Sequence, residues 1–209
     1  NDQRLVLLFF CVVGAVLMAK LLGWLQTPFA YDAHGLRHWL APGKTIVGGL
    51  LGAWIGIEIG KWRLGIQSKT GDLYLWPLTL GLVLGRIGCF LTGLTDNTHG
   101  LPTKVPWAVN FGDGILRHPT QIYEITFVLL LSLIIHSAYF NQEPEGSRFR
   151  IWMAAYLGFR FVSDWIKPVM LIYLGLSAIQ WACLLGLTWS LYSWQNMRRK
   201  KIHTASKTI

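Results

Sequence analysis

The chain has 209 residues, of which 53% are hydrophobic and only 14% are charged, and its formal net charge at pH 7 is +9. A soluble domain carries roughly 25% charged residues, so this chain lacks the charge that coats a water-facing surface. The composition therefore excludes an ordinary soluble domain, a disordered chain, a disulfide scaffold and a collagen-like repeat.

Six apolar stretches approach the roughly 20 residues that an α-helix needs to cross the hydrocarbon core of a bilayer. In chain order they are 5–25, 46–60, 73–93, 119–140, 150–166 and 174–194. None of them alternates in polarity as the strand of a membrane barrel does. The sequence predicts an all-α integral membrane protein with one transmembrane domain over 1–209. We expect a polytopic bundle of six or seven helices with a polar cavity open to the outer face.

Lysine and arginine are distributed unequally between the two predicted sides of the membrane. The side that carries the N-terminus has 11 of them and the opposite side has 5. The positive-inside rule then places both termini and the basic segment 196–209 in the cytoplasm, and the loops 26–45 and 94–118 on the outer face. The +9 charge is therefore mostly a signal of membrane topology. The basic residues are dispersed at the ends of apolar segments, which predicts no nucleic-acid partner.

Metal ligands and disulfides are not expected. The three cysteines, Cys11, Cys89 and Cys183, lie far apart and inside apolar runs. Such cysteines usually behave as small hydrophobic side chains, and the spacing fits no metal site.

Two arginines, Arg86 and Arg160, lie inside predicted helices at similar depth below the outer surface. An arginine at a helix centre costs at least about 2.5–3.5 kcal/mol on insertion scales, which is tolerated where it pairs with an anion. A planar guanidinium suits a lipid phosphate, because it donates two parallel hydrogen bonds. The alternative is a structural ion pair, with Asp164 one turn beyond Arg160. Lys167 shares the face of Arg160 and Asp164.

Small residues and one further acid mark the neighbouring helices. Gly81, Gly85 and Gly88 surround Arg86 at helical spacing, where they favour close helix packing or a bound ligand. The second helix is also rich in glycine. Glu58, an acid in this apolar helix, is expected to have a buried partner or to be protonated.

The segment 117–124 opens the fourth helix and brings several polar groups to the outer surface. Pro119 suits the first turn, whose free N–H groups attract anions. His118 is a candidate general base, although an ordinary loop histidine explains it equally well. Asp96 and His99 in the preceding loop are rival bases, and Glu124 is another candidate.

These segments resemble a known family. The segment 85–93 (GRIGCFLTG) resembles the glycine–arginine signature of prolipoprotein diacylglyceryl transferases. The segments 117–124 (RHPTQIYE), 156–164 and 176–180 are similar to later segments of that family, in the same order. The similarity runs from about residue 44 to 195. Two positions differ: Val47 replaces the usual histidine before the second helix's glycine pair, and Leu94 replaces the acid that closes the first signature.

The resemblance implies a bacterial inner-membrane enzyme that moves diacylglyceryl from phosphatidylglycerol to a thiol, with no cofactor. The acceptor is the lipobox cysteine in the signal peptide of a prolipoprotein, and glycerol phosphate is the leaving group. The lipid phosphate is expected at Arg86, Arg160, Arg117 and Tyr123, with Asp164 and Glu58 in support. Two alternatives remain: transfer to a different, non-protein acceptor, and lipid binding or transport without catalysis.

Overall fold

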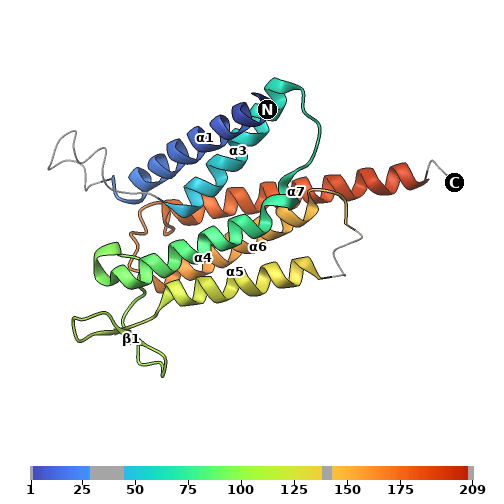
Figure 1. The fold of residues 1–209 in the computed structure, drawn as a ribbon. Coiled ribbons are helices and arrows are strands. Elements are labelled where there is room, and N and C mark those ends of the chain that lie inside the picture. The colour runs from blue at the N-terminus through green and yellow to red at the C-terminus, as the bar shows by residue number, and fades with distance from the viewer. Residues whose placement is uncertain (1, 29–44, 138–142, 207–209) are drawn as a thin grey trace. The chain divides into compact units, whose positions relative to one another are not determined.

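The computed structural model describes residues 2–28, 45–137 and 143–206, which excludes most of the predicted loop 26–45. The described residues form six α-helices and two very short strands (Figure 1). The helices are α1 (Asp2–Gln26), α3 (Ile46–Leu64), α4 (Leu75–Thr92), α5 (Thr120–His136), α6 (Ser147–Ser163) and α7 (Ala178–Ser206). Each of the six apolar stretches overlaps one helix, which confirms the all-α prediction.

The described chain divides into two compact units. Unit 1 comprises residues 1–68 and 169–185, and unit 2 comprises residues 69–168 and 186–209. The long helix α7 contributes its first two turns to unit 1 and the remainder to unit 2. Its helical structure extends to Ser206, so much of the predicted basic tail is helical.

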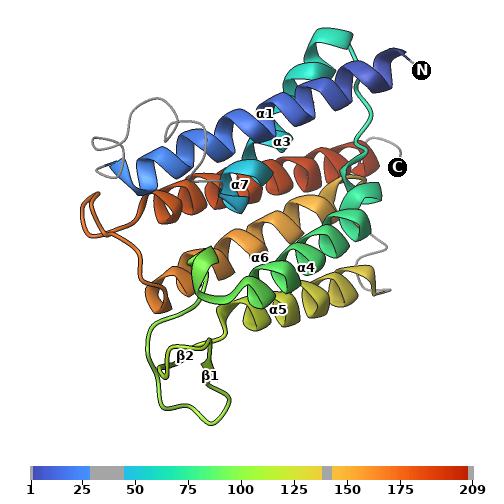
Figure 2. The same cartoon turned by 60° about the vertical axis from the view of Figure 1, so that its left-hand side comes forward.

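In unit 1, α1 and α3 lie side by side over most of their length (Figure 2). Glycines allow this close approach, because a Cβ on Gly52 would meet the carbonyl oxygen of Gly14, and a Cβ on Gly56 would meet that of Phe10. Helix α3 begins where the Thr45 hydroxyl accepts from the Gly48 N–H at 3.2 Å. It ends at Gly65, whose φ of 67° is the left-handed conformation that glycine adopts without strain.

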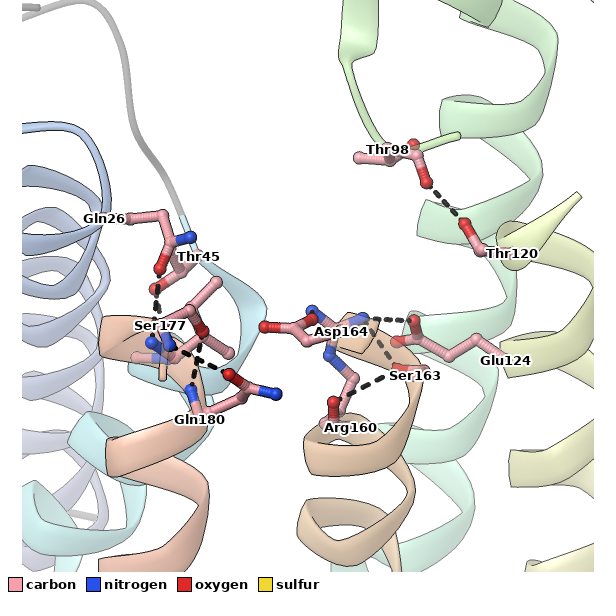
Figure 3. A network of polar contacts seen from close by, with 12 residues as sticks. Gln26, Thr45, Thr98, Thr120, Glu124, Arg160, Ser163, Asp164, Ser177 and Gln180 are labelled. Carbon is pink, nitrogen blue, oxygen red and sulfur yellow. Dashed lines mark hydrogen bonds and ion pairs between the residues drawn. The ribbon is translucent and has the colours of Figure 1, made fainter. Parts of the chain in front are cut away.

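Helix α7 starts four residues later than the apolar stretch predicts, because a reciprocal cap fixes its first turn (Figure 3). The Gln180 N–H donates to the Ser177 hydroxyl at 3.0 Å, and the Ser177 N–H donates to Gln180 Oε1 at 2.8 Å. This arrangement is a capping box, which satisfies two backbone donors at a helix start.

Unit 2 contains α4, α5 and α6, which run alongside one another in both ribbon views (Figures 1 and 2). Its core includes Val128, Met153 and Leu157, all buried. A remote carboxylate fixes the start of α6: Asp72, in the 3-10 turn Gly71–Tyr74, accepts from the N–H groups of Gly146 at 2.7 Å and Phe149 at 2.9 Å. A negative charge at this end also matches the helix dipole.

The segment between α4 and α5 is the predicted outer loop. It opens with a 3-10 turn, Gly93–Asp96, and contains the hairpin of β1 (Val109–Asn110) and β2 (Leu116–Arg117), in which Val109 pairs with Arg117. Backbone bonds join this loop to the starts and ends of neighbouring helices: the Gly100 N–H donates to His118 O at 2.9 Å and the Leu101 N–H to Ile166 O at 2.8 Å.

Two stretches of the described chain are long and apolar enough to cross a membrane: α1 and Gly71–Asp96, which contains α4. Both present large apolar side chains on their surface, among them Phe9 and Leu17 on α1 and Leu84 and Leu91 on α4. In water such a surface would be unfavourable, whereas lipid chains cover it at no cost.

Candidate active site

A buried carboxylate joins three helices of unit 2. Glu124 on α5 lies between two arginines: its Oε2 is 2.8 Å from Arg86 Nη2 on α4 and 3.4 Å from Arg160 Nη1 on α6. The three side chains are between 1% and 6% exposed. The two guanidiniums of similar predicted depth therefore meet at one acid, which the sequence does not assign as their common partner.

Further polar contacts fix both ends of this ion-pair network. Arg160 Nη2 lies 2.9 Å from Asp164 Oδ1, one helical turn away, as the sequence predicts (Figure 3). The Tyr156 hydroxyl donates to Glu124 Oε1 at 2.7 Å, so both oxygens of this carboxylate have partners. Hydrogen bonds that favour the charged form of an acid keep it ionised. Glu124 therefore joins α4, α5 and α6 through contacts at both of its oxygens.

Aromatic packing holds the tyrosine in place. The Trp152 ring stacks on Tyr156 at a centroid distance of 5.3 Å, and both side chains are fully buried. The indole N–H donates to Ser132 Oγ at 3.0 Å, and this hydroxyl also contacts Thr79 Oγ1 at 2.6 Å. Rotation of Tyr156 away from Glu124 would disturb this whole stack.

Counted over the residues that the structure describes, the buried cluster has one cation more than it has anions. Arg86, Arg160 and Lys167 carry positive charge, and Glu124 and Asp164 carry negative charge. Lys167 is 9% exposed and follows the 3-10 turn Asp164–Ile166. Burial, together with the charges of Arg160 and Arg86, lowers the pKa of Lys167 to about 7. Below pH 7 the cluster therefore has a net charge of +1, which favours an anionic ligand.

The Arg86 guanidinium also has an unused donor. Its Nε is buried and has no hydrogen-bond partner within the described residues, although Nη2 pairs with Glu124. Buried donors are rarely left unpaired, so this N–H is available for an acceptor on a ligand. A phosphate oxygen is an acceptor that fits both this geometry and the surplus positive charge.

His118, Tyr123 and Trp107 form a separate aromatic cluster in the loop that opens α5. The Trp107 indole N–H donates to Tyr123 Oη at 2.7 Å, and His118 Nδ1 lies 3.1 Å from the same oxygen. The imidazole is half-buried, and Tyr123 precedes Glu124 in the chain. The structure thus brings the predicted base His118 to the predicted headgroup residue Tyr123.

The remaining loop candidates have local partners. Asp96 Oδ2 accepts from the Thr98 hydroxyl at 2.8 Å, and His99 Nδ1 lies 3.2 Å from Gly100 O. Arg117 pairs with Asp113, with Nη1 2.7 Å from Oδ1, and this hydrogen bond lowers the pKa of Asp113 to about 2.

One predicted residue lies outside the ion-pair cluster, and one buried residue was not predicted from the sequence. Glu58 is exposed on α3 in unit 1. Sequence reasoning missed Gln121, which is buried one turn before Glu124 and contacts Thr98. Its only sequence signal is the three-residue spacing from Glu124. Nowhere in residues 2–28, 45–137 and 143–206 do three histidine, cysteine or acidic side chains gather as a metal site would require.

Comparison with known proteins identifies the family of the chain. The family model described as prolipoprotein diacylglyceryl transferase matches residues 1–195, which include the arginines, Glu124 and the loop between α4 and α5. A phosphatidylglycerol–prolipoprotein diacylglyceryl transferase of Bordetella parapertussis is 32% identical over 191 residues, covering 84% of this chain and 70% of the relative.

Two further relatives carry the same name. The one from Cupriavidus pinatubonensis is 30% identical over 193 residues, covering 85% of this chain and 68% of its own, and the one from Campylobacter jejuni is 26% identical over 204 residues, covering 89% and 72%. The apolar helices agree with the membrane location of this bacterial family. The chain belongs to the prolipoprotein diacylglyceryl transferase family.

Proposed function

We propose that the protein transfers the diacylglyceryl group of phosphatidylglycerol to the lipobox cysteine of a prolipoprotein and releases glycerol phosphate. The observation that carries the proposal is the buried cluster of Arg86, Arg160 and Lys167, whose charge exceeds that of Glu124 and Asp164 by one. A phosphodiester has one negative charge, so a bound phosphatidylglycerol headgroup neutralises the cluster.

The chemistry is a displacement at carbon. The cysteine sulfur forms a bond to the glyceryl carbon, the bond between that carbon and the phosphate oxygen breaks, and its electron pair stays on glycerol phosphate. Negative charge therefore grows on the departing phosphate. Arg86 and Arg160, already held in place by Glu124 and Asp164, stabilise this charge without reorganising.

The thiol proton goes to a base in the outer loop. Glu124 is saturated by two arginines and a tyrosine, which leaves Asp96, His99 and His118 of the four candidates. We assign the role to His118, because it contacts Tyr123, the neighbour of Glu124, and imidazole is the usual general base at neutral pH. The other two candidates have local contacts: Asp96 accepts from the Thr98 hydroxyl, and His99 lies beside the Gly100 carbonyl oxygen.

The setting that we propose is the bacterial inner membrane, crossed several times, with both termini in the cytoplasm. The loop 94–118 would lie on the outer face, where the signal peptide of a prolipoprotein arrives. A polar cavity above Arg86 and Arg160 would open toward this face, and the acyl chains of the lipid would leave it sideways into the bilayer. The excess of basic residues on the N-terminal side supports this orientation.

The proposal is tested with purified protein and phosphatidylglycerol labelled in its headgroup. We expect labelled glycerol phosphate to appear only when a lipobox peptide with cysteine is added, and not with the matched peptide that has serine instead. If glycerol phosphate is released only with a different, non-protein acceptor, the lipobox cysteine is not the acceptor. Lipid binding without release under any of these conditions would show that the protein is not catalytic.

A further inference from the structure

The side-chain amide of Gln121 makes a hydrogen bond through its nitrogen but, within the part of the chain that the structure describes, none through its oxygen. The side chain is 1% exposed on α5, and its Nε2 donates to the Thr98 hydroxyl at 3.0 Å. Its Oε1 is buried and accepts no hydrogen bond from any residue that the structure describes. Buried amide oxygens nearly always have a donor, so this atom indicates a partner outside the chain.

The orientation of the amide follows from the hydrogen-bond chain. A hydroxyl has one hydrogen to donate, and Thr98 donates it to Asp96 Oδ2 at 2.8 Å. The Thr98 oxygen must therefore accept from its other neighbour, which requires the NH2 group of Gln121 on that side. The unused atom is consequently the carbonyl oxygen, an acceptor with no hydrogen of its own.

This acceptor lies beside the ion-pair cluster. Gln121 and Glu124 are three residues apart on the buried face of α5, a spacing at which side-chain Cβ atoms lie about 5–6 Å apart. Glu124 in turn contacts Arg86, whose Nε is an unused donor. One region of unit 2 thus offers a free donor on a cation and a free acceptor on a neutral amide.

A ligand that satisfies both atoms needs an anionic acceptor and a neutral donor. A phosphate with a nearby hydroxyl has both, and glycerol phosphate is a small headgroup that combines them. An ammonium headgroup also donates, but Arg86, Arg160 and Lys167 would repel it.

We propose that Gln121 Oε1 accepts a hydrogen bond from a headgroup hydroxyl while Arg86 Nε donates to the phosphate, so that Gln121 selects hydroxylated anionic lipids. The inference rests on the proposed function and deepens it. Gln121 is then a specificity-determining residue, and its substitution acts on the choice between lipids of equal charge.

The experiment compares two lipids, phosphatidylglycerol and phosphatidylpropanol, which has the same phosphodiester and a three-carbon headgroup without hydroxyls. Binding to the full chain in detergent is measured by native mass spectrometry, and headgroup release is measured in parallel. We expect the wild type to prefer phosphatidylglycerol about tenfold, and Gln121→Met to bind both lipids equally. The control Thr98→Val removes the hydroxyl that contacts Gln121 and Asp96 but keeps the Gln121 amide, and it should keep the preference within about twofold.

Three results would overturn the inference. If the wild-type protein binds the two lipids equally, it does not recognise the headgroup hydroxyls. A Gln121→Met variant that still prefers phosphatidylglycerol places the recognition elsewhere. Equal loss in Thr98→Val and Gln121→Met shows that the glutamine only anchors the loop. Failure of the proposed function is a separate outcome: lipid preference in binding, but no headgroup release with a lipobox peptide.

Discussion

At the level of single residues, the Arg86 guanidinium would combine a structural task with the lipid-binding task that we propose for it. One of its nitrogens pairs with Glu124 at 2.8 Å, and another is a buried donor that nothing in the described chain uses. A planar, multiply donating group can do both, whereas a compact ammonium can do only one at a time. This difference makes lysine a diagnostic substitution.

We expect Arg86→Lys to lower turnover about 10- to 150-fold, although the charge is kept. Charge-assisted hydrogen bonds contribute roughly 1.5–3 kcal/mol each, and about 1.36 kcal/mol is a factor of ten in rate. Headgroup release is measured alongside the thermal midpoint in detergent, with exposed Arg63→Lys as the control. Near-normal turnover, or a loss that follows unfolding, would reduce Arg86 to a structural partner of Glu124.

Lys167 predicts a pH dependence of lipid binding. Its pKa of about 7 lies below the ordinary lysine value because of burial and the charges of Arg160 and Arg86. Above pH 7 the lysine becomes neutral, and the cluster with Glu124 and Asp164 loses its surplus positive charge. The affinity for anionic phosphatidylglycerol should therefore fall between pH 6 and pH 8.

The measurement is binding of labelled phosphatidylglycerol at pH 6, 7 and 8. In Lys167→Met the affinity should be low throughout, and the pH dependence should disappear. If the variant keeps the dependence, another group causes it, with the histidines of the outer loop as the next to be tested. The same pKa has a consequence for stability: between pH 7 and 10.5 the unfolded chain binds more protons, so the Lys167 contribution to the unfolding free energy rises with pH.

The sequence predicted the two arginines and the Arg160–Asp164 pair, but not the bridge between the helices. Helical spacing alone places Asp164 one turn from Arg160, so that contact is local and predictable. The Glu124 contacts depend on how α4, α5 and α6 are rotated toward one another, which no local pattern determines. Gln121 was missed for the same reason. Its Nε2 donates to Thr98 while its Oε1 has no hydrogen-bond donor among the described residues, and only the packing of the helices shows this.

At the level of helices, apolar length predicts the elements and remote contacts determine their ends. All six stretches overlap a helix because each has enough apolar residues to bury or to face lipid. The start of α6 depends on Asp72, more than 70 residues earlier, and the start of α7 on the Ser177–Gln180 cap. Neither end could be placed from hydropathy, which varies smoothly across them.

The glycines of α3 and α4 should respond oppositely to alanine. A Cβ on Gly52 would meet the Gly14 carbonyl oxygen, whereas a Cβ on Gly81 would meet nothing within 4 Å. We expect Gly52→Ala to destabilise the protein by about 1–3 kcal/mol, the usual cost of overpacking. Gly81→Ala should leave it unchanged or stabilise it by about 0.5–1 kcal/mol, because alanine favours a helix. Equal thermal midpoints for both variants would show that α1 and α3 tolerate separation.

At the level of the whole molecule, the distribution of basic residues predicts the orientation in the membrane. In the predicted topology these residues number 11 on the N-terminal side and 5 on the other. The outer-loop candidates, Asp96, His99 and His118, all belong to the segment between α4 and α5. For a lipobox peptide to reach them from outside the cell, this segment must face away from the cytoplasm.

Cysteine labelling tests this orientation directly. In a chain without its three natural cysteines, Thr95→Cys should react with a membrane-impermeant maleimide added to intact cells, because Thr95 is exposed in the predicted outer loop. Thr95 is preferable to Asn97, whose φ of 51° disfavours cysteine. The control Ser68→Cys, at an exposed position after α3 on the predicted cytoplasmic side, should react only after permeabilisation. The reverse pattern would invert the molecule in the membrane, and it would remove the proposed base His118 from the side on which prolipoproteins are modified.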